Sequence, residues 1–178
     1  MKIQFEEFID EIDTLVEFLT SETWEFYGTP NLKAERIRAS YENQHYTGDD
    51  CKTFWVISDD DTKVGMIRIY DLEDGDPLFD IRISSKYKGM GIGSITVKWL
   101  VDYVFTNYPD KNRIEANTRQ DNYAMRTVFH KCGFAKEAYH RKAWPQEGKL
   151  YDAIGYGITK EDWEKGETTP VDWNDFKY

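Results

Sequence analysis

The chain of 178 residues is long enough for one ordinary domain, or for a domain with a small appendage. Its 23 Lys and Arg residues against 33 Asp and Glu residues give a net charge of −10, which argues against a nucleic-acid binder and against docking on anionic lipid. An acidic field attracts cations, so a positively charged small molecule or peptide is the favoured partner, although the same charge also serves plain solubility.

The composition is that of a folded domain in a reducing compartment. Hydrophobic residues make up 40% and aromatic residues 16% of the chain, which is enough for a core. No apolar run approaches the ~20 residues of a membrane span, and the acidic N-terminus lacks the apolar stretch of a signal peptide. Two cysteines, Cys51 and Cys132, are too few for a disulfide framework, so we expect a cytoplasmic protein. The histidines stand apart and no Cys-x-x-Cys pair occurs, so no metal site is predicted.

The first two predicted elements are helices. Apolar residues between Phe5 and Leu19 recur at three- and four-residue steps, which places them on one face of a helix. A second helix is predicted from Thr29-Pro30 to about Tyr41, because Thr caps helices well and Pro suits the first helical position.

The hydrophobic period then changes from helical to alternating. Three short strands separated by polar turns are predicted at residues 54–57, 64–70 and 78–83, and the close spacing of the first two indicates an antiparallel hairpin. In the third strand Phe79, Ile81 and Ile83 face one way, whereas Asp80 and Arg82 face the other.

The second half of the chain alternates helices and strands. A long helix with an apolar stripe from Val97 to Tyr108 ends at Pro109, and a shorter helix begins at Asp121 or Asn122. Further elements are strands at 113–117, 135–144 and 149–158, a helix stop at Gly133, and a short last helix capped by Thr159.

This order predicts the fold class and the domain organisation. It indicates an α+β protein in which helices flank a mixed, mostly antiparallel sheet, with a single α/β-type crossover between residues 78 and 117. We expect one domain over residues 1–165. The acidic and aromatic tail, residues 166–178, is expected to pack along the surface or against a partner.

A glycine-rich loop lies between the third strand and the long helix. In Lys88-Gly89-Met90-Gly91-Ile92-Gly93 the glycines allow a sharp turn and close approach of a ligand, and free amides at a helix start can bind phosphate. A flexible turn is the alternative. Two common phosphate motifs fit poorly, because no Gly-Lys-Ser/Thr follows and because the spacing differs from Gly-x-Gly-x-x-Gly.

A third pattern fits the loop well. Lys88-x-x-Gly91-x-Gly93 resembles the Arg/Gln-x-x-Gly-x-Gly/Ala signature of the GNAT acetyltransferases, and the segment from Asn122 to Phe134 resembles that family's Asn-x-x-Ala/Ser…Lys-x-Gly-Phe signature. Residues 151–156 resemble its last strand. The resemblance covers about residues 54–164 and is greatest to the branch with the ribosomal-protein N-terminal acetyltransferases.

The resemblance implies an activity and a co-substrate. It implies the GNAT fold with a splayed pair of strands that holds acetyl-CoA. It also implies an N-acetyltransferase that passes an acetyl group to a primary amine, on a small molecule or a peptide N-terminus, by direct attack in a ternary complex. A CoA-binding module without catalysis, for sensing or assembly, is the alternative. The sequence is compatible with a homodimer and does not specify one.

The resemblance also assigns residues to the cofactor. The backbone of Ile81 and Ile83 would bind the pantetheine, and the remaining cofactor-binding residues would be Lys88, Gly89, Met90, Gly91, Ile92, Gly93, Ser94, Asn117, Asn122 and Lys131. Lys88 departs from the usual Arg or Gln but keeps a positive charge beside the phosphates. Asn122 has a second role as a helix cap, and Lys131 could serve only the helix dipole.

Two carboxylates are candidates for the general base. A protonated amine must lose a proton before it attacks a thioester, and the resemblance places Asp80 and Glu115 on the two splayed strands. Glu115 matches the position at which some relatives carry a glutamate base, but a solvated pairing with Arg113 or Arg119 is the alternative. For Asp80 the alternative is an ion pair with Arg82.

The general acid of many family members is missing. The position of their tyrosine, seven residues after the motif asparagine, is Phe129 here, which its apolar neighbours assign to the core. A thiol of pKa roughly 8.5 can leave unaided. Tyr123 and Tyr139 are possible substitutes. Cys132 is interpreted as a core residue rather than a nucleophile, because no histidine and acid accompany it.

The acceptor amine is the least specified partner. Aromatic residues cluster in and after the first helices and could line an acceptor cleft or belong to the core; they are Trp24, Phe26, Tyr27, Tyr41 and Tyr46. Rings beside acidic residues suit a cation. Because CoA is a polyanion, we expect the excess acid to lie around the acceptor entrance and positive charge to lie around the cofactor.

Overall fold

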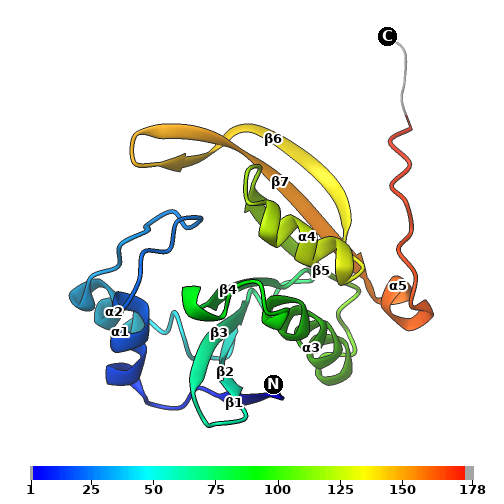
Figure 1. The fold of residues 1–178 in the computed structure, drawn as a ribbon. Helices are drawn as coiled ribbons and strands as arrows, with labels where there is room; N and C mark the ends of the chain where they lie inside the picture. The colour runs from blue at the N-terminus through cyan, green and yellow to red at the C-terminus, as the bar shows by residue number, and fades with distance from the viewer. Residues whose placement is uncertain (1, 175–178) are drawn as a thin grey trace.

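The computed structural model describes residues 2–174 and has thirteen elements (Figure 1). In chain order they are β1 (Ile3–Glu7), α1 (Ile12–Thr20), α2 (Ala34–Glu42), β2 (Cys51–Ser58), β3 (Lys63–Tyr70), β4 (Leu78–Ile83), the 3-10 helix η1 (Ser85–Tyr87), α3 (Ile92–Asn107), β5 (Arg113–Arg119), α4 (Tyr123–Lys131), β6 (Ala135–Gln146), β7 (Lys149–Thr159) and α5 (Lys160–Lys165). No helix within this part of the chain is long and apolar enough to cross a membrane.

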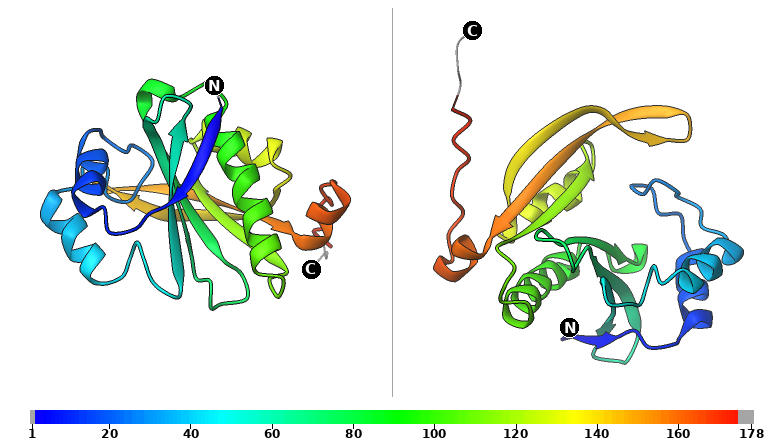
Figure 2. Two further views of the ribbon diagram at one scale, coloured as in Figure 1. Left: turned by 90° about the horizontal axis from the view of Figure 1, so that it is seen from below. Right: turned by 180° about the vertical axis from the view of Figure 1, so that it is seen from behind.

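The strands form two antiparallel sheets that meet at β4 and β5. One sheet has the order β1-β2-β3-β4 and the other the order β5-β7-β6. The crossover through α3 brings β5 beside β4, where the Glu115 amide donates a hydrogen bond to the Pro77 carbonyl at 3.0 Å. Beyond that point the two strands separate, and the long β6–β7 hairpin arches over the rest of the molecule (Figures 1 and 2). The predicted splayed pair is thus present, between two sheets rather than within one.

Helices cover the sheets from opposite sides. The larger core lies between the sheets and the pair α3 and α4, and it includes Ile67, Leu100, Val104, Ile114, Phe129 and Ile154. A second core lies under α1 and α2 and includes Leu15, Leu19, Trp24, Ile37, Trp55 and Met66. The apolar stripes predicted for the two later helices are confirmed, because both face the larger core.

The prediction of one helix from Phe5 to Leu19 is wrong. Ile3–Glu7 is the edge strand β1, paired with β2, and the helix begins only at Ile12. In this segment the apolar residues fit the helical period as well as the alternation of a strand, and tertiary packing decides between the two structures. The ring of Phe5 stacks on Trp99 of α3 at 4.1 Å between centroids, whereas Ile9 lies in the connection and is 73% exposed.

The second helix begins later than predicted. It starts at Ala34 without a side-chain cap, four residues after Pro30. The carbonyl of Pro30 accepts a hydrogen bond from the Trp24 amide at 2.8 Å, so residues 24–30 close into a loop instead of starting a helix. The connection of residues 21–33, called the α1–α2 loop below, rises toward the β6–β7 hairpin (Figures 1 and 2).

The later elements follow the predictions closely. β4 has the predicted bounds, the Asn122 side chain accepts a hydrogen bond from the Met125 amide, and Gly133 has φ of 85°. Thr159 caps α5 as expected. The start of the tail is fixed by the hydroxyl of Thr168, which donates to the Gly133 carbonyl, and the chain then extends away from the body. Residues 175–178 of the predicted tail lie outside the described residues, and the domain boundary at residue 165 stays a prediction.

Candidate active site

A cavity of about 260 Å³ lies where β4 and β5 separate, and it is called the central cavity here. It collects residues from the α1–α2 loop, both splayed strands, α4 and the β6–β7 hairpin. Its lining residues are Phe26, Tyr27, Gly28, Tyr70, Phe79, Asp80, Ile81, Asn117, Thr118, Asn122, Met125, Phe129 and Trp144.

The open edge of β4 borders this cavity. The amide of Ser84 donates to Val64 on β3, and the carbonyl of Pro77 accepts from β5. Since backbone groups alternate along a strand, Ile81 and Ile83 direct theirs toward the open edge. These are the two residues that the family resemblance assigns to the pantetheine. Apart from the Tyr27 hydroxyl on the Ile81 carbonyl, the edge is open to an extended ligand in the way an added strand would use it.

The glycine loop ends at the start of α3 with free amides. Gly89 and Gly91 have φ of 80° and 82°, and a Cβ at either position would meet nothing within 4 Å. Gly91 precedes the helix, and its carbonyl accepts from Ser94 and Ile95. The amides at the very start of a helix have no partner in the preceding turn. This open, amide-lined turn fits the pyrophosphate of CoA.

Lys88 supplies positive charge beside the loop. Its side chain is exposed, and it is close enough to Glu22 to act on that carboxyl electrostatically. Glu22 accepts hydrogen bonds from the Ser85 amide at 2.9 and 3.0 Å. Burial alone would raise the pKa of Glu22, but the hydrogen bonds from Ser84 and Ser85 and the charge of Lys88 outweigh burial and lower it.

The two asparagines assigned to the cofactor lie together on the cavity wall. Asn117 and Asn122 both line the central cavity. The Asn122 amide group donates to the Thr118 hydroxyl at 3.1 Å while its oxygen caps α4. Asn122 therefore is a helix cap as well as a cavity residue, as the sequence allowed. Lys131 is exposed in the last turn of α4 and does not line the cavity.

The structure separates the two candidate bases. Asp80 lines the central cavity, and its carboxylate forms an ion pair with Arg82 at 3.5 Å. Glu115 is not among the lining residues. Arg113 bridges it at 2.9 Å to Glu137 at 2.7 Å, across the outer surface of the β5-β7-β6 sheet. Asp80 is thus the lining carboxylate of this cavity, whereas Glu115 belongs to a three-residue ion-pair cluster beside it.

The tyrosines named as substitutes for a general acid lie away from the cavity. Tyr123 is 70% exposed on α4, and the Tyr139 hydroxyl donates to Asp152 on the β6–β7 hairpin. Phe129 is 2% exposed and packs in the core, as predicted. Cys132 is also buried in that core, and burial raises the pKa of its thiol to about 11, which suits a core residue and not a nucleophile.

Aromatic rings form the acceptor side of the cavity. Of the five named from the sequence, Phe26 and Tyr27 line it, whereas Trp24, Tyr41 and Tyr46 pack in or against the core under α1 and α2. The Tyr27 hydroxyl donates a hydrogen bond to the carbonyl of Ile81. Burial, and to a smaller extent the charge of Asp80, raises the pKa of Tyr27 far above its ordinary value, so the phenol stays protonated.

Sequence reasoning did not assign several lining residues to the site, among them Tyr70 and Trp144. Tyr70 ends β3, and Trp144 follows an irregular stretch of β6. The indole nitrogen of Trp144 is buried without a hydrogen-bond partner among the described residues. The strand pattern of the sequence placed both residues at strand ends, but only the curvature of the hairpin brings Trp144 over the cavity.

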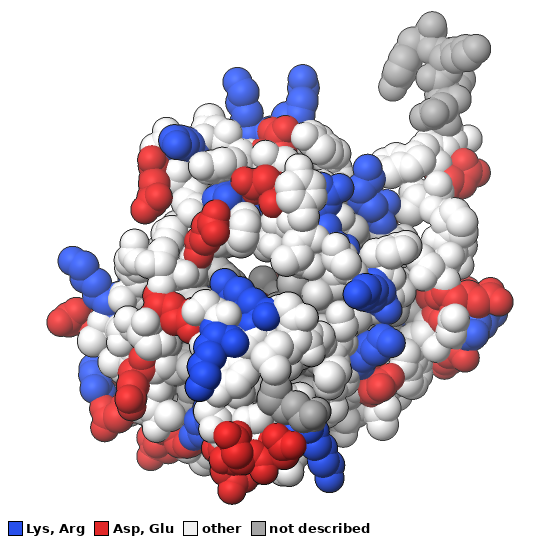
Figure 3. Space-filling view, in the orientation of Figure 1, with Lys and Arg blue, Asp and Glu red and all other residues white. Residues whose placement is uncertain are grey.

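Charge is divided on the face that carries this site. Figure 3 shows a hollow in the middle of the face, with Lys and Arg side chains directly below it and to its right. Asp and Glu side chains lie along its left rim and gather at the lower edge of the molecule. Cationic and acidic regions thus border one opening. That the acidic region serves the acceptor and the cationic region serves the cofactor stays a prediction.

Among the solved structures with this fold are spermidine N-acetyltransferases of Vibrio cholerae. One from Vibrio cholerae, in complex with CoA and spermine, has a TM-score of 0.80 at 14% identity and covers 91% of this chain and 98% of its own. A chimera of the Vibrio cholerae enzyme SpeG and hSSAT has a TM-score of 0.81 at 16% identity, over 92% and 99% of the two chains. At this identity the likeness establishes the fold.

Curated relatives and a family model agree with that fold. "SPbeta prophage-derived uncharacterized N-acetyltransferase YokL" of Bacillus subtilis is 25% identical over 62% of this chain and 63% of its own. "Putative ribosomal N-acetyltransferase YdaF" of the same species is 26% identical over 59% and 58%. The match therefore spans less than two thirds of these relatives. The model of the acetyltransferase (GNAT) domain matches residues 3–135. The resemblance drawn from the two sequence motifs is confirmed, and the chain belongs to the GNAT acetyltransferase family.

Proposed function

We propose that the protein is an acetyl-CoA-dependent N-acetyltransferase that acts on a cationic primary amine. One observation carries this proposal: the carboxylate of Asp80 and a set of aromatic rings share a cavity with the open edge of β4. The glycine loop and the start of α3 follow directly after β4 in the chain. A thioester held along that edge would meet an amine held by the rings and the carboxylate.

Different residues bind different parts of the cofactor in this proposal. The backbone of Ile81 and Ile83 holds the pantetheine, while the amides of Gly89 to Ser94 and the charge of Lys88 hold the phosphates. Asn117 and Asn122 contact the cofactor from the opposite wall. A backbone amide at the open edge polarises the thioester oxygen, and Lys131 adds positive charge toward the adenosine phosphates.

The reaction is a direct transfer between two bound substrates. The nitrogen of the neutral amine forms a bond to the thioester carbonyl carbon, the carbon–sulfur bond breaks, and CoA leaves as the thiolate. The second proton, which the nitrogen gives up as the amide forms, passes to the thiolate or to water. The amine must first lose its proton, and Asp80, directly or through a water, is the base that the cavity geometry supports. Glu115 is the second candidate, because the family resemblance favours its position.

The acceptor is proposed to carry further positive charge. Rings beside a carboxylate suit an ammonium group, and the acidic rim in Figure 3 would attract a polycation. Several similar solved structures are spermidine N-acetyltransferases, so polyamines are the first acceptors to test. Peptide N-termini are the comparison, suggested by the relative named a putative ribosomal N-acetyltransferase.

An acceptor screen tests the proposal. The protein is incubated with labelled acetyl-CoA and a panel of polyamines, amino acids and peptides with free N-termini, and both acetylated product and released CoA are measured. We expect saturable transfer to at least one cationic amine. Absence of acetyl-CoA and CoA binding at millimolar concentration in calorimetry would reject the proposal. Tight CoA binding without transfer to any amine would favour a CoA-binding module instead.

A further inference from the structure

We infer that Arg119 is a positioning residue that fixes the α1–α2 loop over the acceptor end of the central cavity. This inference rests on the proposed function. Arg119 ends β5 and does not itself line the cavity. It links the loop that supplies Phe26, Tyr27 and Gly28 to the sheet that supplies Trp144.

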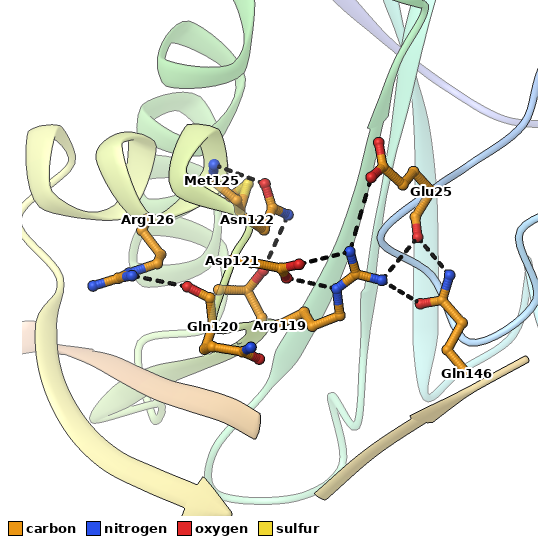
Figure 4. A network of polar contacts seen from close by, with 9 residues as sticks. Glu25, Arg119, Gln120, Asp121, Asn122, Met125, Arg126 and Gln146 are labelled. Atoms are coloured by element: carbon orange, nitrogen blue, oxygen red, sulfur yellow. Dashed lines mark hydrogen bonds and ion pairs between the residues drawn. The ribbon is translucent and has the colours of Figure 1, made fainter. Parts of the chain in front are cut away.

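The guanidinium of Arg119 is bound by a carboxylate and packed against two aromatic rings. Its side chain is 5% exposed, and Asp121 binds it through two oxygens at 2.6 and 3.0 Å (Figure 4). The rings of Phe26 and Tyr151 lie 4.6 and 4.1 Å from its central carbon. A planar cation that is both forked to a carboxylate and placed against aromatic rings has a single well-defined orientation.

The Arg119 side chain binds a backbone carbonyl of the α1–α2 loop. Arg119 donates to the carbonyl of Glu25 at 3.5 Å, and Gln146 donates to the same carbonyl at 2.7 Å. Arg119 also donates to the Gln146 side chain at 2.9 Å, which closes a triangle of hydrogen bonds between β5, β6 and the loop (Figure 4). The loop is therefore held at a backbone atom directly before Phe26 and Tyr27.

Two further contacts tie the loop to the opposite sheet. Glu22 accepts from the Ser85 amide after β4, and the Tyr27 hydroxyl donates to Ile81 on β4. The loop thus spans the opening between the two sheets, and Arg119 with Gln146 forms its attachment to the β5-β7-β6 side. Without that attachment, the cavity wall formed by Phe26 to Gly28 loses its fixed distance from Trp144.

Two readouts test this role independently of each other. Hydrogen exchange of the amides in residues 22–30 reports the attachment of the loop without any substrate. Steady-state kinetics with the best amine of the acceptor screen reports the acceptor site. The variants are Arg119→Lys, Arg119→Met and Gln146→Leu. The matched control is Lys111→Met, because Lys111 is also a buried cation bound to a carbonyl, that of Asp74, and it does not line the central cavity.

We expect faster exchange in the loop and a selective loss of acceptor binding in the Arg119 variants. The KM for the amine should rise by about tenfold, the change expected for charged hydrogen bonds lost on one side of a binding site. The kcat should change by less than about threefold, since loss of uniform binding raises KM alone. Acetyl-CoA affinity should not weaken. Arg119→Lys should retain little of the wild-type behaviour, because the Lys side chain lacks the planar fork of the guanidinium.

Non-additivity gives a second, sharper expectation. Arg119 and Gln146 hold the same carbonyl, so the double variant should raise KM by less than the product of the single effects. Unchanged loop exchange in Arg119→Met would overturn the attachment, whatever the activity. Faster exchange with an unchanged amine KM, or an equal effect in Lys111→Met, would overturn the acceptor role. If the protein transfers acetyl to no amine in the screen, the proposed function and this acceptor role are both rejected. The hydrogen-exchange result still decides whether the loop is attached at Arg119.

Discussion

The hydroxyl of Tyr27 donates a hydrogen bond to the backbone carbonyl of Ile81, 54 residues later in the chain. That carbonyl lies on the open edge of β4, where the pantetheine is proposed to bind. The loop that forms the acceptor wall therefore occupies a polar group that the cofactor would use. Acetyl-CoA must either share that carbonyl or displace the phenol.

Removing this hydroxyl should tighten cofactor binding. In Tyr27→Phe the free protein loses one hydrogen bond that the complex does not need, and a net hydrogen bond of about 0.5–1.5 kcal/mol corresponds to roughly two- to tenfold in affinity. Calorimetry with CoA measures the change. Tyr41→Phe is the control, because Tyr41 also donates to a partner, Asp10, outside the central cavity. Weaker binding in Tyr27→Phe would show that the hydroxyl contacts the cofactor itself.

Reversing the charge of Lys88 should weaken CoA binding. Lys88 stands next to the open glycine turn, and its charge faces the phosphates in the proposed complex. We expect Lys88→Glu to lower CoA affinity by about tenfold at low salt, with a smaller effect at high salt, because exposed charges are screened. Lys86→Glu reverses a neighbouring charge in η1 and is the control. Equal effects of the two variants would mean that only the general field matters, and not the position of Lys88.

The Asp80 and Glu115 variants should differ in turnover. Asp80→Asn removes the lining carboxylate of the central cavity, and loss of a general base lowers kcat by about a hundredfold or more. Glu115→Gln should cost less than about tenfold, since Glu115 is ion-paired with Arg113 and does not line the cavity. Single-turnover kinetics at saturating acetyl-CoA separates these effects from binding. A greater loss in Glu115→Gln would assign the base to Glu115.

Gly65 keeps β3 close to the strand that carries the cofactor edge. A Cβ at this position would lie 2.5 Å from the Arg82 carbonyl and 2.6 Å from the Ile83 side chain. Gly65→Ala must therefore push β4 away, and overpacking of this kind costs about 1–3 kcal/mol of unfolding free energy. Gly75→Ala is the control, because nothing lies within 4 Å of its Cβ. Urea denaturation measures both, and equal stabilities would contradict the close approach of the strands.

The sequence predicted the cofactor half of this site better than the acceptor half. The turn at Gly91 and the cap at Asn122 are set by local chemistry, a positive φ and a side-chain oxygen, which residue type reveals directly. The start of the chain was misassigned because residues 3–9 fit two periods, and only the packing of Phe5 on Trp99 selects the strand.

The acceptor half depends on contacts between distant segments. The distance from Glu25 to Gln146 is 121 residues along the chain, and no local pattern marks either residue as the partner of Arg119. Trp144 lines the cavity and follows a register shift between His140 and Trp144 in β6, an irregularity that the sequence pattern does not indicate. The strand position of Asp80 is enough to name it as a candidate. That Asp80 lines the cavity and Glu115 does not depends on how the two sheets curve away from each other, which the sequence does not show.

The two thiols should be unreactive in the folded protein. Burial is the main cause that raises the pKa of both Cys51 and Cys132, in Cys132 from 9.0 to about 11. At pH 8 neither should react with a disulfide reagent until the chain is unfolded, and prompt reaction of Cys132 would contradict its place in the core.

The Cys132 thiol should also make the stability of the protein depend on pH. In the unfolded chain this thiol ionises first as the pH rises, so the unfolded state binds fewer protons and the free energy of unfolding falls. The stability that the neutral Cys132 thiol contributes is therefore complete below pH 9 and is lost as the pH approaches about 11. Urea titrations at a series of pH values should show the free-energy difference between the wild type and Cys132→Ala shrinking across that window, and a constant difference would contradict the burial of the thiol.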